Sequence, residues 1–323
     1  MLRRRTLAGL TVALPFIADA RAQAQGDWPD RPLRLIVPFA PGGANDIVAR
    51  LLAQKLTEAL GQPCVVENRP GAQATLGTEL VARARPDGTT LLVAASGPIT
   101  VSPATNPRLS YDPRRDLAPI SLLADFPLVL LVGADRPVQD LAGLAAWARA
   151  EPGRMSYAFP SASFQLAHEL LKQRTGIEAV PVAYRGSADC VNAVAAGDVA
   201  MVLTDSGPAT AGLQSGRVKA LAITAAERLP GFPGVPTMAE SGLPEMQIAL
   251  WTGLLAPAGT PGPVIERLHH EAARAMAAPD LATRLTALAM RPVGSTPAQF
   301  RETISREILL WSEVAQRSNI RFQ

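Results

Sequence analysis

The sequence contains few of the residues on which metal sites are usually built. Its 323 residues include three histidines and two cysteines. His269 and His270 are adjacent, so on a helix they point about 100° apart and cannot bind one metal ion from a single face. No Cys-x-x-Cys pair, zinc-type spacing or His-Glu-x-x-His motif occurs. The sequence therefore predicts no metal site.

Recognisable catalytic motifs are also missing. There is no Gly-x-Ser-x-Gly nucleophile turn, no phosphate-binding Gly-x-x-x-x-Gly-Lys-Ser/Thr loop and no Gly-x-Gly-x-x-Gly dinucleotide signature. Ser96 stands in Ala-Ala-Ser-Gly-Pro, which is not a nucleophile motif. We therefore expect no catalytic residue and no cofactor, although an exported α/β enzyme stays as one alternative.

The two cysteines, Cys64 and Cys190, are far apart in the chain, and the predicted elements place them in different domains. Pairing is open to them in an oxidising compartment. We expect both to be buried free thiols.

Charge is low and uneven: 18% of the residues are charged, and the formal net charge is +3. The excess comes from four arginines near the start, Arg3, Arg4, Arg5 and Arg21. Without the first 24 residues, basic and acidic side chains balance, and no run of Lys or Arg is present to follow phosphates. This composition excludes a nucleic-acid partner.

The first 24 residues have the pattern of a signal peptide. A charged start precedes an apolar stretch over residues 6–17, which is too short for a transmembrane helix. Small residues at Ala20, Ala22 and Ala24 predict cleavage near Ala22 or Ala24. Arg4-Arg5-Thr6-Leu7 leaves twin-arginine and general export both open. We expect a periplasmic protein.

Strand and helix patterns alternate along the rest of the chain. Strands are predicted at 33–39, 65–66, 89–95, 128–133, 155–158, 179–182, 199–204, 219–224 and 250–256. Helices are predicted at 47–60, 76–84, 141–150, 165–175, 187–196, 261–277, 280–288 and 297–314, with a short one after residue 204 and a proline-rich loop at 107–119. This alternation predicts an α/β fold with mainly parallel sheets and domain boundaries near residues 125 and 248.

Three turns between a strand and a helix are candidate anion sites. Pro41-Gly42-Gly43 precedes Asn45 and Asp46 at a helix start, where backbone N–H groups and the helix dipole favour a negative group. Ser161 and Ser163 occupy a second such turn, and Tyr184-Arg185-Gly186 a third, with a fixed positive charge. A plain αβ connection, a helix cap or a solvated arginine are the alternatives for these turns.

Motifs along nearly the whole mature chain resemble those of one family. They are residues 32–43 (PLRLIVPFAPGG), 65–72 (VVENRPGA), 86–92 (PDGTTLL), 111–113 (YDP), 181–186 (PVAYRG), 221–224 (LAIT), 235–237 (VPT) and 251–261 (WTGLLAPAGTP). In this order they resemble the Bug-type periplasmic solute-binding proteins, the receptors of tripartite tricarboxylate transporters.

The resemblance implies a two-lobed type II periplasmic-binding-protein fold, of the Venus-flytrap kind, which closes on a ligand. Residues 25–124 and 249–323 would form domain 1, and residues 125–248 domain 2. The ligand site implied is Phe39, Ala40, Gly42, Gly43, Ala44, Asn45, Asp46, Ser96, Ser161, Ser163, Phe164, Gln165, Tyr184, Arg185, Gly186 and Asp205.

One loop departs from the family pattern. The second loop is usually rich in glycine and serine before a histidine, whereas here Gln165 takes the histidine position and Phe164 precedes it. Phe164 predicts a narrower cleft or a contact with an apolar part of the ligand. His168, three residues further on, is a second candidate for the histidine position.

The sequence thus predicts a monomeric receptor that captures a small carboxylate or amino-acid-like ligand and delivers it to multi-spanning membrane permease subunits. A ligand-loaded partner of a membrane sensor would have the same fold and site, so this alternative stays open.

Overall fold

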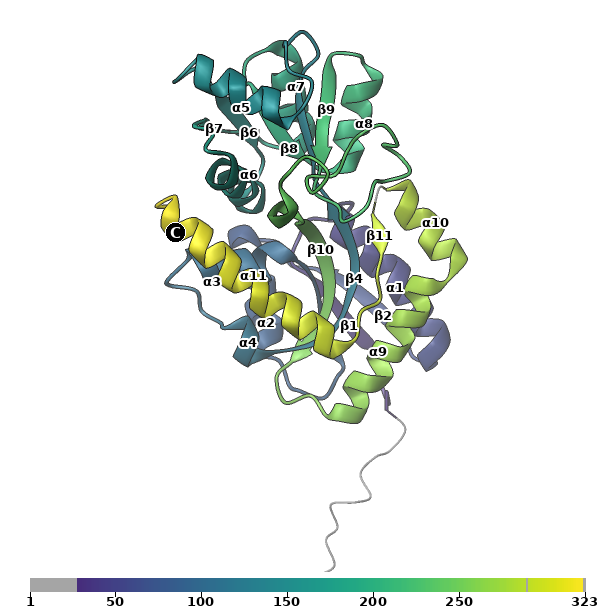
Figure 1. Cartoon of the computed structure of the whole chain (residues 1–323). Helices are drawn as coiled ribbons and strands as arrows, with labels where there is room; N and C mark the ends of the chain where they lie inside the picture. Colours follow the sequence, from purple (N-terminus) through teal and green to yellow (C-terminus); the bar gives the residue numbers. More distant parts are fainter. Residues whose placement is uncertain (1–27, 289, 322–323) are drawn as a thin grey trace, which may run out of the picture.

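A computed structural model describes residues 28–288 and 290–321, which form two α/β halves, each built around one sheet (Figure 1). The predicted leader, residues 1–24, lies outside the described residues. None of the described helices has the length and apolar character needed to span a bilayer. Cys64 and Cys190 are free thiols on separate halves. Cys190 is buried as predicted, but Cys64 is only half-buried.

The first sheet has six strands in the order β11-β4-β10-β3-β1-β2. Their bounds are β1 Leu33–Val37, β2 Cys64–Asn68, β3 Thr90–Ala95, β4 Leu117–Pro127, β10 Ala249–Pro257 and β11 Arg291–Pro292. The second sheet has five strands in the order β7-β6-β8-β5-β9. Their bounds are β5 Val129–Gly133, β6 Ser156–Phe159, β7 Val180–Ala183, β8 Met201–Thr204 and β9 Val218–Ile223.

Helices cover both faces of each sheet. In the first half they are α1 Ala44–Leu60, α2 Thr75–Ala82, α3 Ser102–Thr105, α4 Pro113–Asp116, α9 Gly262–Ala277, α10 Pro279–Ala287 and α11 Pro297–Arg317, with short helical turns η2 Ala72–Ala74 and η3 Gly97–Val101. In the second half they are α5 Leu141–Ala150, α6 Ala162–Thr175, α7 Ser187–Ala196 and α8 Ser206–Gln214, and a short turn, η4 Pro244–Met246, follows this half.

Burial on both faces explains why the strands are continuous apolar runs. Leu35 packs in the core with α1 and α9, whereas its neighbour Ile36 packs on the opposite face with Trp251 and Phe300. Successive side chains of a strand point to opposite faces, so a strand covered on both sides needs apolar residues at every position.

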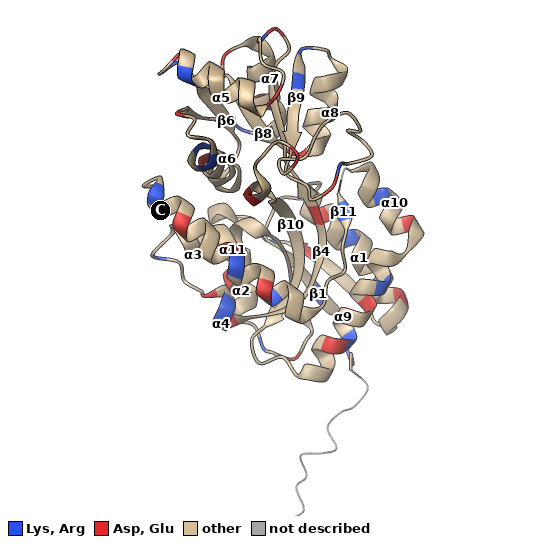
Figure 2. Ribbon diagram, in the orientation of Figure 1, with Lys and Arg blue, Asp and Glu red and all other residues tan. Residues whose placement is uncertain are grey.

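Acidic and basic side chains alternate over α9, α10 and α11 (Figure 2), without a continuous basic stripe on these helices.

The sheets are mixed, so the prediction of mainly parallel sheets was wrong in this detail. β1 pairs in parallel with β2 and β3, and β6 with β7 and β8. The pairings of β4, β5, β9, β10 and β11 are antiparallel. β4 continues directly into β5 of the other sheet, so neither strand is reached through the helical crossover that parallel neighbours in one sheet require.

The predicted proline-rich loop at 107–119 was also partly wrong, because it contains α4 and the start of β4. Pro119 lies next to a register shift opposite Leu254 and Leu255 of β10. A proline has no N–H to donate, and a bulge tolerates that loss within a paired strand.

The halves are joined where β4 passes into β5 and where the chain returns into β10. The Leu128 N–H donates to the Thr224 hydroxyl oxygen at 2.8 Å, and the Thr224 N–H donates to the Leu128 carbonyl at 2.9 Å. The Thr224 hydroxyl in turn donates to the Ile248 carbonyl at 2.5 Å. Thr224 therefore ties the two crossing segments together.

Candidate ligand-binding site

The predicted turns lie where helices begin at the carboxyl ends of strands. α1 follows β1, α6 follows β6, α7 follows β7 and α8 follows β8. Their cap residues are Gly43, Ser161, Gly186 and Asp205, and none of these provides a side-chain cap to the first-turn amides. Ligands of open α/β sheets bind at this edge, and uncapped helix starts present N–H groups to anions.

In the turn after β1, Asp46 binds the turn itself. Its carboxylate accepts hydrogen bonds from the Gly42 N–H, the Arg50 guanidinium and the Asn68 side-chain amide, each at 2.9 Å. Asn68 also donates to the Phe39 carbonyl at 3.1 Å. The turn is thus held rigid from within.

Asp46 is 3% exposed, and burial alone would raise its pKa. The hydrogen bonds from Arg50, Gly42 and Asn68 outweigh that effect and lower the pKa below its ordinary value. The ionised carboxylate therefore positions the turn, while the exposed Ala40, Gly43 and Ala44 form its outer surface.

The same turn is attached to β10, at the position where β10 pairs with the end of β3. The Thr252 hydroxyl on β10 donates to Asn45 Oδ1 at 2.7 Å. Thr252 lies opposite Ala95, the last residue of β3, and Ser96 comes next and is buried. Asn45 and Ser96 are therefore brought to one edge of the first sheet.

The start of α6 touches this edge from the second half. A β-carbon placed on Gly97 would lie 3.4 Å from Ser163 Oγ, which joins the segment after β3 to the first turn of α6. Ser161 is exposed, and Ser163 and Phe164 are buried. Phe164 packs in the core with Val101, and its contact with a ligand stays a prediction.

His168 is fully buried and stacks on Tyr157 at 4.3 Å between ring centroids. Its Nδ1 lies 2.8 Å from the Phe164 carbonyl, and its Nε2 accepts the Leu203 N–H at 2.7 Å. Burial lowers the pKa of His168 to about 3, so the ring is neutral with its proton on Nδ1. It is a bridge between α6 and β8, not the ligand-facing histidine considered from the sequence.

At the end of β8, Asp205 is half-buried and accepts a hydrogen bond from the Ser187 hydroxyl at 2.9 Å. Burial raises the pKa of Asp205 above its ordinary value, against the effect of that hydrogen bond. The hydroxyl oxygens of its neighbours Thr204 and Ser206 are buried and have no partner among the described residues. Buried polar groups are usually satisfied, so these two hydroxyls suit a bound ligand or water.

The remaining predicted residues lie beside them. Tyr184 and Gln165 are half-buried, Gly186 caps α7, and Arg185 is exposed. Arg185 makes no hydrogen bond or ion pair with any other residue in the described part of the chain. It is therefore available as a cation for a ligand.

The sequence located the turns but missed the residues that support them. Asn68, Thr252, Thr204 and Ser206 were not predicted. Asn68 follows the strand predicted at 65–66 by two residues, and a position just after a predicted strand is the signal that marked the other turns. The role of Thr252 depends on pairing between distant strands, which no local pattern reveals. No cluster of metal-binding side chains occurs within residues 28–288 and 290–321.

Residues 48–320 match the family model described as the tripartite tricarboxylate transporter family receptor. A Pseudomonas sp. (strain P51) protein from the tcbD-tcbE intergenic region is 38% identical over 315 residues, which cover 97% of this chain and 93% of that protein.

Solved structures agree with that match. MatC from Rhodopseudomonas palustris with bound malate is 35% identical, with a TM-score of 0.73, covering 89% of this chain and 99% of that one. The periplasmic binding protein BugD is 31% identical, with a TM-score of 0.74 and coverage of 92% and 100%. A second R. palustris protein, with adipate, is 32% identical, with a TM-score of 0.77 and coverage of 91% and 99%. The chain therefore belongs to the tripartite tricarboxylate transporter receptor family, the Bug-type periplasmic solute-binding proteins that its motifs resemble.

Proposed function

We propose that the protein captures a small dicarboxylate between its two halves and delivers it to tripartite tricarboxylate-type membrane permease subunits. The observation that carries this proposal is the set of four uncapped helix starts at the carboxyl ends of β1, β6, β7 and β8. Arg185, which has no ion-pair partner among the described residues, directly precedes the α7 start. The malate and adipate bound to two relatives support a dicarboxylate.

The binding energy would come from several modest contributions. A micromolar dissociation constant needs about 8 kcal/mol. Each helix start supplies roughly 0.3–1 kcal/mol toward an anion, so hydrogen bonds to the charged carboxylates, at about 1.5–3 kcal/mol each, must supply most of it. Arg185 and the buried Thr204 and Ser206 hydroxyls are the groups in place to make them.

Ligand capture would proceed by closure of domain 2, residues 125–248, on domain 1, residues 25–124 and 249–323. The tie through Thr224 lies at the two crossings between these segments and is where such a motion would bend. We further propose export by the leader, cleavage near Ala22 or Ala24, a monomeric receptor, and no chemistry performed on the ligand.

The test is binding of malate and adipate to purified protein by calorimetry, with Gly43→Val as the decisive variant. A β-carbon at Gly43 would meet only the Ala40 carbonyl oxygen, at 3.9 Å, so the fold should tolerate it. The added side chain stands at the α1 start, where the carboxylate would approach. We expect affinity to fall at least tenfold, about 1.4 kcal/mol.

Gly262→Val is the matched control, because Gly262 also starts a helix and a β-carbon there meets nothing within 4 Å. It should bind like the wild type. Equal affinity of Gly43→Val and wild type would remove the β1 turn from the site. Failure of malate, adipate and a panel of mono- and tricarboxylates to bind would overturn the carboxylate proposal.

A further inference from the structure

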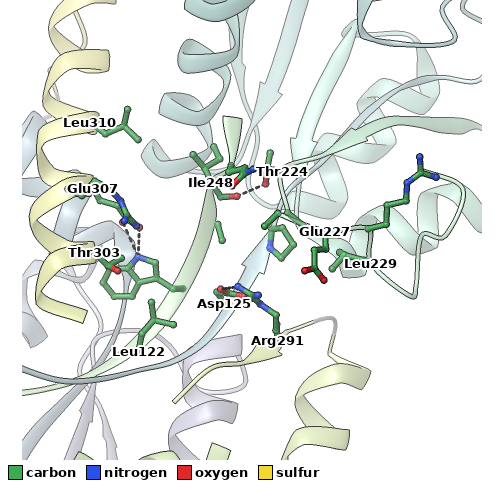
Figure 3. A pocket seen from close by; sticks show the side chains of 18 of the residues that line it. Leu122, Asp125, Thr224, Glu227, Leu229, Ile248, Arg291, Thr303, Glu307 and Leu310 are labelled. Atoms are coloured by element: carbon green, nitrogen blue, oxygen red, sulfur yellow. Dashed lines mark hydrogen bonds and ion pairs between the residues drawn. The ribbon is translucent and has the colours of Figure 1, made fainter. Parts of the chain in front are cut away.

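A pocket of about 510 Å³ lies at the crossing between the halves, apart from the turns described above (Figure 3). Its walls come from both crossing segments, from β11 and from α11, and include Asp125, Thr224, Trp251, Arg291, Glu307 and Trp311. None of the predicted ligand-site residues lines it. Glu307 extends from α11 toward it and carries the hydrogen bonds drawn there.

Glu307 is held by donors from two other elements. The Trp251 indole N–H lies 3.0 Å from Oε1 and 2.9 Å from Oε2. The Thr100 hydroxyl oxygen, on the buried turn η3, lies 3.1 Å from Oε2. The same Thr100 oxygen lies 3.0 Å from the carbonyl oxygen of Ser96, one turn earlier.

The Thr100 hydroxyl has a single hydrogen, and it faces two oxygens. When Glu307 is ionised, both neighbours are acceptors, and only one receives the hydrogen. When Glu307 is protonated, it donates to Thr100, and Thr100 is free to donate to the Ser96 carbonyl. The charge on Glu307 therefore determines whether the Ser96 carbonyl keeps this bond.

The Ser96 segment is part of the candidate ligand site. Ser96 directly follows β3, and a β-carbon placed on the next residue, Gly97, would lie 3.4 Å from Ser163 Oγ in the first turn of α6. We propose that Glu307 is a proton-operated positioning residue, which acts through the Thr100 hydroxyl to set the Ser96–Gly97 segment and thereby the affinity for ligand. The link to affinity rests on the proposed function, whereas the effect on the segment does not.

The surroundings of Glu307 support titration in the neutral range. Burial raises the pKa of Glu307 to about 7, against the hydrogen bonds from Trp251 and Thr100 and the positive charge of Arg306. A group with this pKa changes charge within the ordinary range of external pH.

Other charged groups face the pocket from the elements around it. Arg306 lies on α11, and Asp125 on β4 forms an ion pair with Arg291 on β11 at 2.6 Å. Glu227 and Arg228 come from the loop after β9, and Arg228 is engaged by Glu240 at 3.0 Å. η3 and α3 contain no titratable side chain, and His168 of α6 is bound to Leu203 and Phe164.

The first experiment follows amide and indole nitrogen–proton NMR signals of the ligand-free protein from pH 5.5 to 8.5. We expect the Trp251 indole, identified by its loss in Trp251→Phe, and the Gly97 amide to shift with one common midpoint near pH 7. In Glu307→Gln, whose side-chain amide imitates the protonated acid, both shifts should disappear. In Thr100→Val, the Trp251 indole signal should still shift with pH, whereas the Gly97 amide signal should not.

The wild-type titration needs no variant to fold and can overturn the proposal alone. Absence of a midpoint between pH 6 and 8 at Trp251 would show that Glu307 does not titrate there. A Gly97 shift that survives in Thr100→Val would show that the hydroxyl does not carry the effect.

The second experiment measures malate and adipate affinity at pH 6.5 and 8.5. The protonated state satisfies both hydrogen bonds and fixes the segment, so wild type should bind at least threefold more tightly at pH 6.5. Glu307→Gln should lose this dependence. Binding with the same pH dependence in both proteins would overturn the coupling, whereas no binding at either pH would count against the proposed function and leave the NMR result standing.

Discussion

Each half of the molecule fixes its edge of the candidate site with one buried titratable side chain, which is ionised in the first half and neutral in the second. In the first half, ionised Asp46 gathers three donors around the turn after β1. In the second half, neutral His168 bridges the carbonyl of Phe164 and the N–H of Leu203, between α6 and β8. Asp46 forms an ion pair with the solvent-exposed Arg50, whereas His168 is fully buried and has no counter-ion among its described partners.

The two halves also differ in what they leave unpaired. The polar groups that hold the β1 turn are engaged with one another, while Thr204 and Ser206 in the second half have no described partner. A rigid edge facing an unsatisfied edge suits a receptor that completes its polar contacts with a ligand. This difference can be tested one side chain at a time.

The largest effect is expected for His168→Leu. The change leaves the buried Leu203 N–H without an acceptor and removes the stacking on Tyr157. We expect the free energy of unfolding to fall by about 2–4 kcal/mol at pH 7.5, measured by urea denaturation. His270→Leu is the control, because His270 is exposed, and it should stay within about 0.5 kcal/mol of wild type.

The difference in unfolding free energy between wild type and His168→Leu should depend on pH. The folded-state pKa of His168 is lowered to about 3, so its contribution is complete above pH 6.5 and is lost progressively as the pH falls from 6.5 toward 3. The difference in unfolding free energy between wild type and His168→Leu should therefore become smaller as the pH falls from 6.5 to 5. A constant gap over that range would mean that the ring is not held neutral.

Asp46→Asn should lower the free energy of unfolding by about 1.5–3 kcal/mol, less than His168→Leu does at pH 7.5. An amide keeps the shape but loses the charge, and its NH₂ group would face the donors of Arg50 or Asn68. The folded-state pKa of Asp46 is lowered, so its contribution is present above about pH 3.8 and is lost as the pH falls through the folded value. At pH 5 this penalty should remain, while that of His168→Leu has shrunk.

Asp280→Asn is the matched control for Asp46→Asn. Asp280 pairs with Lys55 at 2.8 Å on the surface, where its side chain is 65% exposed. An exposed ion pair contributes about 0–1 kcal/mol, so a loss as large as that of Asp46→Asn would contradict the role given to the β1 turn.

Local sequence signals were enough for most of the fold. The predicted bounds of α5 and α7 are those of the structure, since Asp140 caps the first helix and Gly197 ends the second with a left-handed backbone. β4 was missed, because the prediction had a proline-rich loop up to residue 119 and its next strand only at 128–133. Pro119 argues against a strand unless a bulge accommodates it, and the bulge depends on the partner strand. The antiparallel pairing of β4 and β10 likewise arises from the return of the chain between halves.

For the candidate site too, local sequence signals found the turns, whereas roles that depend on long-range contacts were missed. The turns after β1, β6 and β7 were found because glycine or serine precedes a helix pattern. The ligand-facing interpretation of His168 was wrong because its ring is fully buried and its Nε2 accepts the Leu203 N–H of β8. Asn68, Thr252 and Thr204 were missed because their roles depend on contacts with residues far away in the chain or on burial.

Arg185→Ala tests whether Arg185, which has no hydrogen-bond or ion-pair partner among the described residues, serves a ligand. Arg185 is exposed and contacts no acid among the described residues, so its removal should leave the melting temperature unchanged. We expect malate and adipate to bind about tenfold more weakly by calorimetry, about 1.4 kcal/mol. Arg149→Ala, at another exposed position on α5, should bind normally. An equal loss for uncharged ligands would indicate packing instead of charge.

The smallest effect on stability is expected for Thr204→Val. This change in the second half should not destabilise the protein, whereas the same change at Thr252 in the first half should. The Thr204 hydroxyl has no described partner, so replacing it with a methyl group should leave the free energy of unfolding unchanged or raise it by up to about 1 kcal/mol. Thr252→Val is equally buried but removes the 2.7 Å bond to Asn45, and should lose about 1 kcal/mol. If Thr204 turns toward the ligand, malate affinity should fall several-fold in Thr204→Val despite its unimpaired stability. A destabilised Thr204→Val with normal malate affinity would instead make this hydroxyl part of the framework, like those of the β1 turn.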